Sequence, residues 1–296
     1  MRVRIKVIAC ETIKSEIMEA VSNQASMESV SIQPSYIFLE HGLHRRPELM
    51  KDRIQEHIDS SHGYDLVVLG YGLCSNGVLG VRARECPIVI PRVDDCIALL
   101  LGSREAYLRE FAREPGTYYL TPGWIKYGGD PLKTYREYSE KYDRETALWI
   151  TREMMKHYTR VAYIRTEAEE GKEGPQQLGG GEEGGESLWQ LGGGIIGGPE
   201  ASVEEAHKPC SRDWRAYARE VADFLGMRYE ELEGSLDLLK RLVPRDGAPG
   251  CEGGSWKWDD DFVLLWPGEE LTVEKMRTDG ISREGRGFEE TQRIEL

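Results

Sequence analysis

The chain has 296 residues, 40% of them hydrophobic and 30% charged, which is typical of a globular protein with one or two domains. Its formal net charge of −14 repels phosphate backbones, so the composition argues against nucleic acid as a partner. The longest apolar runs have the length of strands, and the first residues lack the pattern of a signal peptide. We therefore expect a cytoplasmic protein without a membrane span, whose six cysteines stay reduced.

Strand and helix signals alternate along residues 1–125. We expect strands at 3–9, 35–39, 65–70, 88–91 and 117–120, and helices at 14–21, 47–58 and 96–113. The strands are continuously apolar, which is typical of a sheet that is covered on both faces. Their order between helices predicts parallel strands with right-handed crossovers.

The second half continues with a helical stretch at 132–157, a strand at 160–164, helices at 214–225 and 236–242, and a last strand at 262–265. A glycine-rich segment between them has too few large side chains to fold by itself. The fold class we expect is α/β, a doubly wound, mostly parallel sheet in a single domain. Its parts are a sheet core with a strand-end site (1–166), a disordered glycine-rich insertion (167–210), a continuation of the same sheet (211–275) and a mobile tail (276–296).

Three cysteines stand where predicted strands end: Cys10, Cys74 and Cys96. In a parallel sheet these carboxyl ends share the edge where ligands bind, so the three thiols are expected to converge. As thiolates they would bind zinc, or an iron–sulfur cluster with one iron left open, and His41 or His44 would complete or neighbour the site. Cys96 begins a predicted helix, whose dipole is expected to lower the pKa of its thiol.

Two other interpretations stay open. Free cysteines often pack as small apolar side chains, and no C-x-x-C pair is present to favour a metal. Alternatively, Cys96 is the nucleophile of a metal-free enzyme, with His41 or His44 as its base. The same strand ends carry five more residues that we expect to support the ligands or to bind substrate: Asn76, Arg92, Asp94, Asp95 and Trp124. One of the two aspartates is expected to cap the helix that begins at Cys96.

Four segments resemble a family of uncharacterised proteins from anaerobic bacteria and methanogenic archaea. They are YGLCSNG (71–77), IPRVDDCIALLLGS (90–103), PGTYYLTPGW (115–124) and WDDDFVLLWPG (258–268). The family is known as a domain of unknown function and is often encoded beside corrinoid-dependent methyltransferases. The resemblance implies an anaerobic setting in one-carbon metabolism, with a corrinoid protein or a methyltransferase as partner.

The leading expectation for function is therefore a zinc or iron–sulfur protein of corrinoid-linked methyl metabolism. Its metal would activate a methyl acceptor, or its cluster would move electrons to cobalt. The rival expectation is a non-catalytic accessory binding module for a methyltransferase or corrinoid protein, in which the cysteines are structural.

Overall fold

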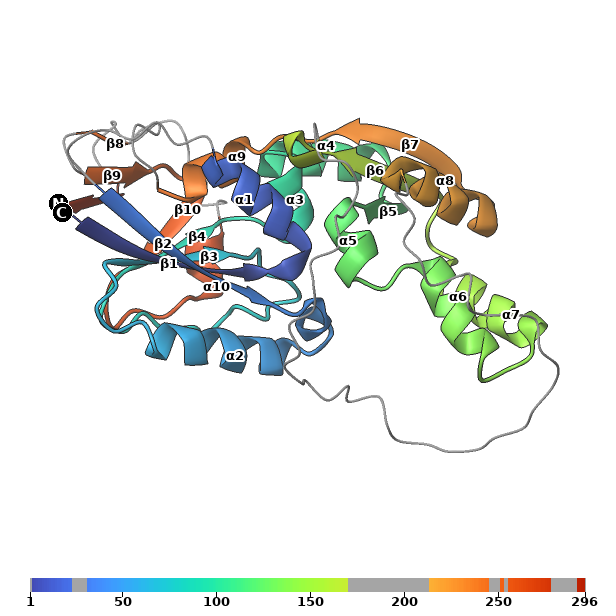
Figure 1. The fold of residues 1–296 in the computed structure, drawn as a ribbon, viewed down its shortest axis with the longest axis horizontal. Coiled ribbons are helices and arrows are strands. Elements are labelled where there is room, and N and C mark those ends of the chain that lie inside the picture. Colours follow the sequence, from blue (N-terminus) through green and yellow to red (C-terminus); the bar gives the residue numbers. More distant parts are fainter. Residues whose placement is uncertain are drawn as a thin grey trace.

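The computed structural model describes residues 2–22, 31–169, 213–244, 251–252, 255–277 and 292–295. All but the first three residues of the predicted glycine-rich insertion lie outside this range, and so do residues 278–291 of the predicted tail. The fold class is α/β, as the sequence predicts, with a mostly parallel first sheet and a second parallel sheet beside it (Figure 1). Within the described ranges, every helix is too short or too polar to span a bilayer.

The first sheet has five strands in the order β10-β4-β3-β1-β2. Four run parallel: β1 (Arg2–Cys10), β2 (Ser31–Leu39), β3 (Leu66–Gly70) and β4 (Ile88–Pro91). The edge strand β10 (Phe262–Leu265) pairs with β4 in the antiparallel sense. After β2 the chain returns to the other side of β1, so the sheet has its topological switch point between β1 and β3. Ligands of open α/β sheets bind outside the carboxyl ends of the strands at such a point.

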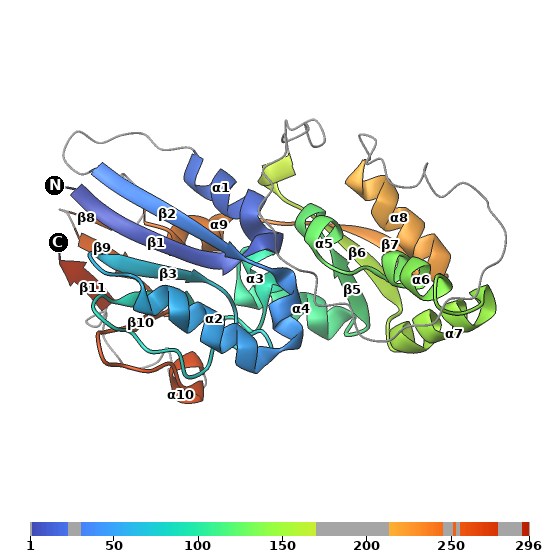
Figure 2. The same ribbon diagram turned by 60° about the horizontal axis from the view of Figure 1, so that its bottom comes forward.

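Helices cover both faces of this sheet, as Figures 1 and 2 show. One face packs against α1 (Lys14–Ser22), α3 (Cys96–Leu100) and α9 (Asp237–Leu242). The other packs against α2 (Pro47–Asp59), and α10 (Val273–Met276) lies on the same side. β3 and β4 are buried along their whole length because neither face meets solvent, which explains their unbroken apolar sequences.

A second parallel sheet contains β5 (Thr117–Leu120), β6 (Arg160–Arg165) and β7 (Arg228–Glu233). The helices around it are α4 (Arg104–Arg113), α5 (Pro122–Tyr127), α6 (Pro131–Ser139), α7 (Arg144–Met155) and α8 (Trp214–Leu225). The sequence predicts one sheet, but in the part of the chain that the structure describes these strands form ladders only with one another. Buried residues of β6 and β7 nevertheless belong to the same hydrophobic cluster as β1, so the two sheets share a core.

Two predicted helices are each divided in two by local caps. The predicted helix 96–113 breaks at Gly102, whose φ of +82° ends α3, and the Ser103 hydroxyl then accepts the Ala106 N–H at the start of α4. The predicted helix 132–157 becomes α6 and α7, because Asp143 caps a new helix by accepting the Thr146 N–H. Caps of this kind re-aim the chain without changing its apolar pattern.

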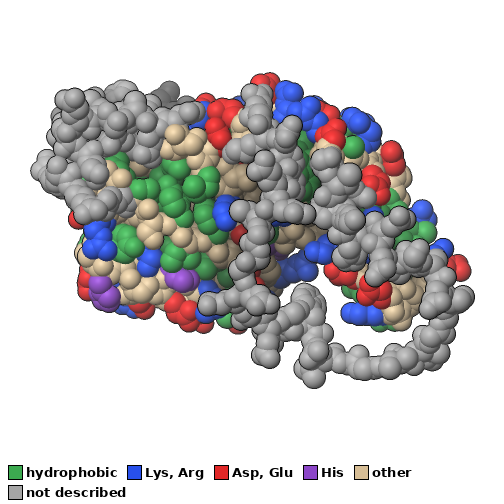
Figure 3. Space-filling model, viewed as in Figure 1, with side chains coloured by type: hydrophobic (Ala, Val, Ile, Leu, Met, Phe, Trp, Pro, Cys, Tyr) green, Lys and Arg blue, Asp and Glu red, His purple; other side chains and the backbone are tan. Residues whose placement is uncertain are grey.

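A small third sheet joins β8 (Cys251–Glu252), β9 (Ser255–Trp258) and β11 (Gln292–Glu295), the last from the segment predicted to be a mobile tail. Three 3-10 turns complete the fold: η1 (Glu11–Ile13), η2 (His41–Arg45) and η3 (Glu167–Glu169). On the coloured part of the face in Figure 3, acidic and basic side chains are interspersed rather than gathered by sign.

Candidate functional site

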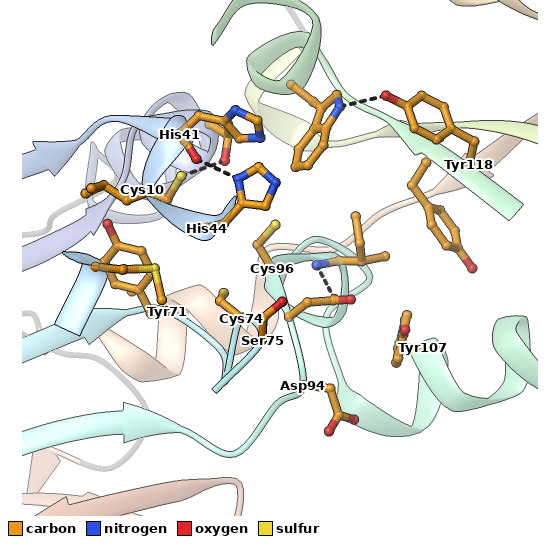
Figure 4. Close-up of a pocket in the computed structure, with 18 of the residues that line it drawn as sticks. Cys10, His41, His44, Tyr71, Cys74, Ser75, Asp94, Cys96, Tyr107 and Tyr118 are labelled. Atoms are coloured by element: carbon orange, nitrogen blue, oxygen red, sulfur yellow. Dashed lines mark hydrogen bonds between the residues drawn. The ribbon is translucent and has the colours of Figure 1, made fainter. Parts of the chain in front are cut away.

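A cavity of about 440 Å³ opens at the carboxyl ends of the first sheet and extends to the second sheet. All three strand-end cysteines and both strand-end histidines line it: Cys10, His41, His44, Cys74 and Cys96. In Figure 4 the three sulfur atoms face the same space as the His44 ring. Seven aromatic side chains also line it: Tyr71, Tyr107, Phe111, Tyr118, Tyr119, Trp124 and Tyr158. A cavity of this size, between two layers of a protein, is typical of a small-molecule site.

The ends of β1 and β2 are tied together by one hydrogen bond. The Glu11 carboxylate, directly after Cys10, accepts the backbone N–H of His41 at 2.7 Å. In the same turn the Thr12 hydroxyl donates to the Cys10 sulfur at 3.2 Å. These contacts fix the first cysteine and the first histidine at one corner of the cavity.

The loops after β3 and β4 are joined in the same way. The backbone N–H groups of Leu73 and Cys74 donate to the carbonyl oxygens of Val93 and Asp94, both at 2.9 Å. A Cβ atom on Gly72 would lie 2.7 Å from the Asp95 nitrogen, so only glycine allows the two loops this close. The close approach brings Cys74 and Cys96 to the same part of the cavity.

The loop that carries Cys74 has a strained backbone. Cys74, Ser75 and Asn76 have φ angles of 45°, 59° and 66°, three consecutive residues in the left-handed region. The Gly77 N–H closes the turn by donating to the Cys74 carbonyl at 3.1 Å. A non-glycine residue in this region costs about 1–2 kcal/mol, and such outliers cluster at functional sites.

The rings of the two histidines and Trp124 are in contact, tilted or edge to face. Ring centroids lie 4.1 Å apart for His41 and His44 and 4.4 Å apart for His41 and Trp124. Trp124 reaches them because α5 packs against η1, where a Cβ on Gly123 would collide with the Thr12 carbonyl. His44 Nδ1 donates to the His41 carbonyl at 2.6 Å, so Nε2 is the ring nitrogen of His44 that this bond leaves for another partner.

Burial keeps the three thiols protonated. It raises the pKa of Cys74 to about 12, with Asp95 and Cys10 adding to the rise. The pKa of Cys96 is raised well above its usual range, first by burial and then by Cys74, and burial also raises the pKa of Cys10. The sequence-based expectation that a helix dipole lowers the pKa of Cys96 is therefore wrong. The helix it begins is only five residues long, and burial outweighs its dipole.

His41 stays neutral, and two polar atoms of the site, one of them on its own ring, are buried without partners among the described residues. Burial lowers the pKa of His41 to about 3, and the charges of His44, Arg45 and Lys133 act in the same direction. Its Nε2 atom and the hydroxyl of Tyr71 are buried without a hydrogen-bond partner among the described residues. Such atoms cost free energy and are rare in folded proteins unless ordered water or a ligand satisfies them.

As placed, the donors do not form a closed metal site. Within the described ranges, no group of three or more His, Cys, Asp or Glu side chains is arranged so that it could hold a metal ion. The chemistry of the donors fits zinc or iron, since thiols and a neutral imidazole are their preferred ligands. Coordination therefore requires at least one side chain to change rotamer, and the ligand roles of the five residues remain predictions.

The five supporting residues of the sequence analysis occupy different places. Asp95 caps α3 by accepting the Ile97 N–H at 2.8 Å, so the predicted cap is confirmed, and Asp94 and Trp124 line the cavity with it. Arg92 and Asn76 are not among the lining residues. Arg92 instead donates to the carbonyl oxygens of Phe262 and Arg277, because β10 lies beside its strand.

Sequence reasoning missed Tyr71 and the aromatic half of the cavity. That half consists of Tyr107, Phe111, Tyr118, Tyr119, Trp124 and Tyr158, of which only Trp124 was expected in the site. Tyr71 lies three residues before Cys74 in the segment YGLCSNG, and this proximity in the sequence could have identified it as a site residue. The others come from α4, β5 and the loop before β6, and only the second sheet brings them to the cysteines.

Fold and cavity define an α/β protein with a binding cavity at the carboxyl ends of its strands. Over residues 38–178 the chain matches a family described as a protein of unknown function (DUF1638). This range includes four of the five candidate ligands, all except Cys10, and it supports the resemblance to an uncharacterised family. No curated protein matches the chain, and no solved structure does.

Proposed function

We propose that this protein binds a metal, zinc or the iron of an iron–sulfur cluster, through the thiolates of Cys10, Cys74 and Cys96. The observation that carries the proposal is the convergence of three thiols, from three separate strand ends, on one cavity beside an imidazole nitrogen that has no hydrogen-bond partner in the described part of the chain. His41 or His44 would supply a fourth ligand through Nε2. This role would explain why the two imidazole rings lie beside the thiols.

The pKa values favour a metal over a free nucleophile. A catalytic cysteine needs a thiolate near neutral pH, but burial raises the pKa of Cys96 far above that range. A base with a pKa of about 3, as in His41, is too weak to remove its proton. A bound metal ion reverses this situation because it deprotonates the thiols that coordinate it.

The strained loop at Cys74 suits a site that closes on its ion. The bonds between zinc and sulfur are about 2.3 Å long, so the three thiols must approach one another to bind one ion. Rotation of the cysteine side chains about χ1, among its three staggered positions, would bring them together. The aromatic half of the cavity then lies beside the metal and would hold a small substrate. Bound zinc would activate a thiol or another methyl acceptor, and a cluster would pass electrons to cobalt.

The wider setting that we propose is corrinoid-dependent methyl metabolism in the cytoplasm of an anaerobe, with a corrinoid protein or a methyltransferase as partner. It rests on the family resemblance. In a thiol assay, the methyl group of methylcobalamin forms a bond to sulfur, cobalt keeps both bonding electrons as cob(I)alamin, and the thiol proton is released. Cob(I)alamin absorbance that appears with the wild type, and not with the Cys74→Ser variant, is the expected result.

The second candidate is a binding module with structural cysteines. It is favoured by the absence, among the described side chains, of a ready metal-binding group. In this case the cavity would bind its ligand through the aromatic half alone.

Metal analysis and an absorption spectrum on anaerobically purified protein separate the two candidates. We expect stoichiometric zinc or iron in the wild type and little in Cys74→Ser, since serine is not ionised near neutral pH. Cys86→Ser is the matched control. Cys86 is also buried, at 6% exposure, but it packs in the cluster under α2 and does not line the cavity. Wild-type protein without metal would leave only the binding module.

A further inference from the structure

The aromatic half of the cavity has fixed ring faces. The Trp124 Nε1–H donates to the Tyr118 hydroxyl at 3.2 Å, and that hydroxyl donates to the Gly129 carbonyl at 3.1 Å. The Tyr158 ring meets Tyr118 edge to face, with centroids 5.4 Å apart and an interplanar angle of 85°. Figure 4 shows Tyr118 on the side of the cavity opposite Cys10. Three rings held in this way need no reordering when a ligand binds.

The charged side chains that line the cavity are acidic. Its lining includes three carboxylates, Glu40, Asp94 and Asp95, and none of the described lining residues is Lys or Arg. Asp95 is partly buried and accepts the Ile97 N–H, a neutral donor, at 2.8 Å. Arg104 contacts Asp94 at 3.8 Å. A ligand with a positive charge would therefore meet carboxylates in the lining, and no basic side chain of the described lining would compete for its place.

We propose that the aromatic half binds a small organic cation, an alkylated ammonium group, against the faces of Trp124 and Tyr118 with Asp95 as its counter-charge. Aromatic faces attract weakly hydrated cations through their quadrupole, and quaternary ammonium is the group that cages of this kind recognise. A cavity of about 440 Å³ suits an organic molecule and is far too large for a bare metal ion. The inference names the substrate class of the proposed metal protein, and it rests on that function only in placing the ligand beside the thiols.

Two ligands of the same shape test the charge directly. Choline and 3,3-dimethylbutan-1-ol differ in one atom of the branched head, nitrogen with its positive charge against carbon. We expect titration calorimetry on the purified wild type to show choline bound at least about tenfold more tightly than the alcohol. Equal affinity for the two, or no binding of choline, would overturn the proposal.

Variants then assign the contacts. Trp124→Leu should weaken choline binding about tenfold, whereas Tyr118→Phe keeps the ring and should change it little. Asp95→Asn should weaken choline and leave the alcohol unchanged, and it should fold, because asparagine is an equally good helix cap. Unchanged choline affinity in both Trp124→Leu and Asp95→Asn would place the ligand elsewhere.

The metal and the cation are measured separately. Cys74→Ser should lose the metal and still bind choline, because Cys74 belongs to the other half of the cavity. A wild type without metal that binds choline would contradict the proposed function alone. A wild type that holds metal but does not bind choline would contradict this inference alone.

Discussion

Two buried polar clusters of the molecule, one around Arg160 and one around the cysteines, differ in whether their polar atoms have hydrogen-bond partners. Arg160 on β6 is fully buried, yet each of its guanidinium nitrogens has a partner. Nε donates to Thr117 at 3.0 Å, Nη1 to Glu230 at 2.6 Å and Nη2 to Thr117 at 2.7 Å. In the cysteine cluster, His41 Nε2 and the Tyr71 hydroxyl are buried without partners among the described residues, beside a strained turn.

The difference separates stability from function. The hydrogen-bonded charges around Arg160 hold β5, β6 and β7 together. Buried polar atoms without partners lower the stability of the folded protein. They are found where the binding of a ligand offsets that loss. Variants in the two clusters should therefore fail in different ways.

The largest effect is expected from Arg160→Met. Removing the guanidinium leaves Glu110 and Glu230 without their buried partner, and the free energy of unfolding should fall by about 3 kcal/mol. Urea denaturation measures it. Arg113→Met is the control, because Arg113 binds the same two glutamates from an exposed position and its loss should matter far less. Equal losses would mean that burial does not distinguish the two arginines.

Next in size is Gly123→Ala. The added methyl collides with the Thr12 carbonyl, so α5 must move away from η1, at a cost of about 2 kcal/mol. The movement also takes Trp124 from the histidines, which its fluorescence should report. The matched control is Gly42→Ala, where the methyl would meet nothing within 4 Å. If both variants unfold at the same denaturant concentration, the packing of α5 does not depend on this contact.

The pH dependence of stability tests His41. Below its ordinary pKa of 6.5 the unfolded chain takes up a proton that the folded protein refuses until about pH 3. The stability that His41 contributes is therefore complete above pH 6.5 and is lost as the pH falls, by about 1.4 kcal/mol per pH unit at most. His41→Gln should flatten the stability curve between pH 6 and pH 4. An unchanged slope would show that the ring is protonated in the folded protein.

The smallest effect is a gain. Ser75→Gly removes a left-handed strain and should raise the free energy of unfolding by about 0.5–1 kcal/mol. Ser15→Gly, in the helical backbone of α1, should lower it instead. A loss of stability in Ser75→Gly would mean that its side chain contributes more than the backbone costs.

These expectations rest on features that the sequence reveals unevenly. Cys10, Cys74 and Cys96 could be placed at one edge because strand ends follow from runs of apolar residues and from the parallel order. The second sheet could not be foreseen, because the residues 117–120 have the same apolar character whichever strand they pair with. Tyr158 is in the cavity only because β6 pairs with β5, and no local pattern marks it.

The chemistry of the thiols was also beyond the sequence. The position of Cys96 at a helix start suggested a lowered pKa, whereas the depth of the cavity raises it. Burial depends on the whole fold, and the helix start is local. The left-handed turn at Cys74 is a further example, since its sequence contains serine and asparagine where glycine would be expected.

Proton release on zinc binding tests the central claim most directly, because it counts the thiols that coordinate. The three thiols are protonated near neutral pH, and zinc takes thiolates, so each bound ion should release about three protons. Calorimetric titration of anaerobic, metal-free protein in buffers of different ionisation enthalpy gives this number. Cys86→Ser should match the wild type and Cys74→Ser should release fewer. Binding without proton release, or with the same release in Cys74→Ser, would contradict the claim that these cysteines hold the metal.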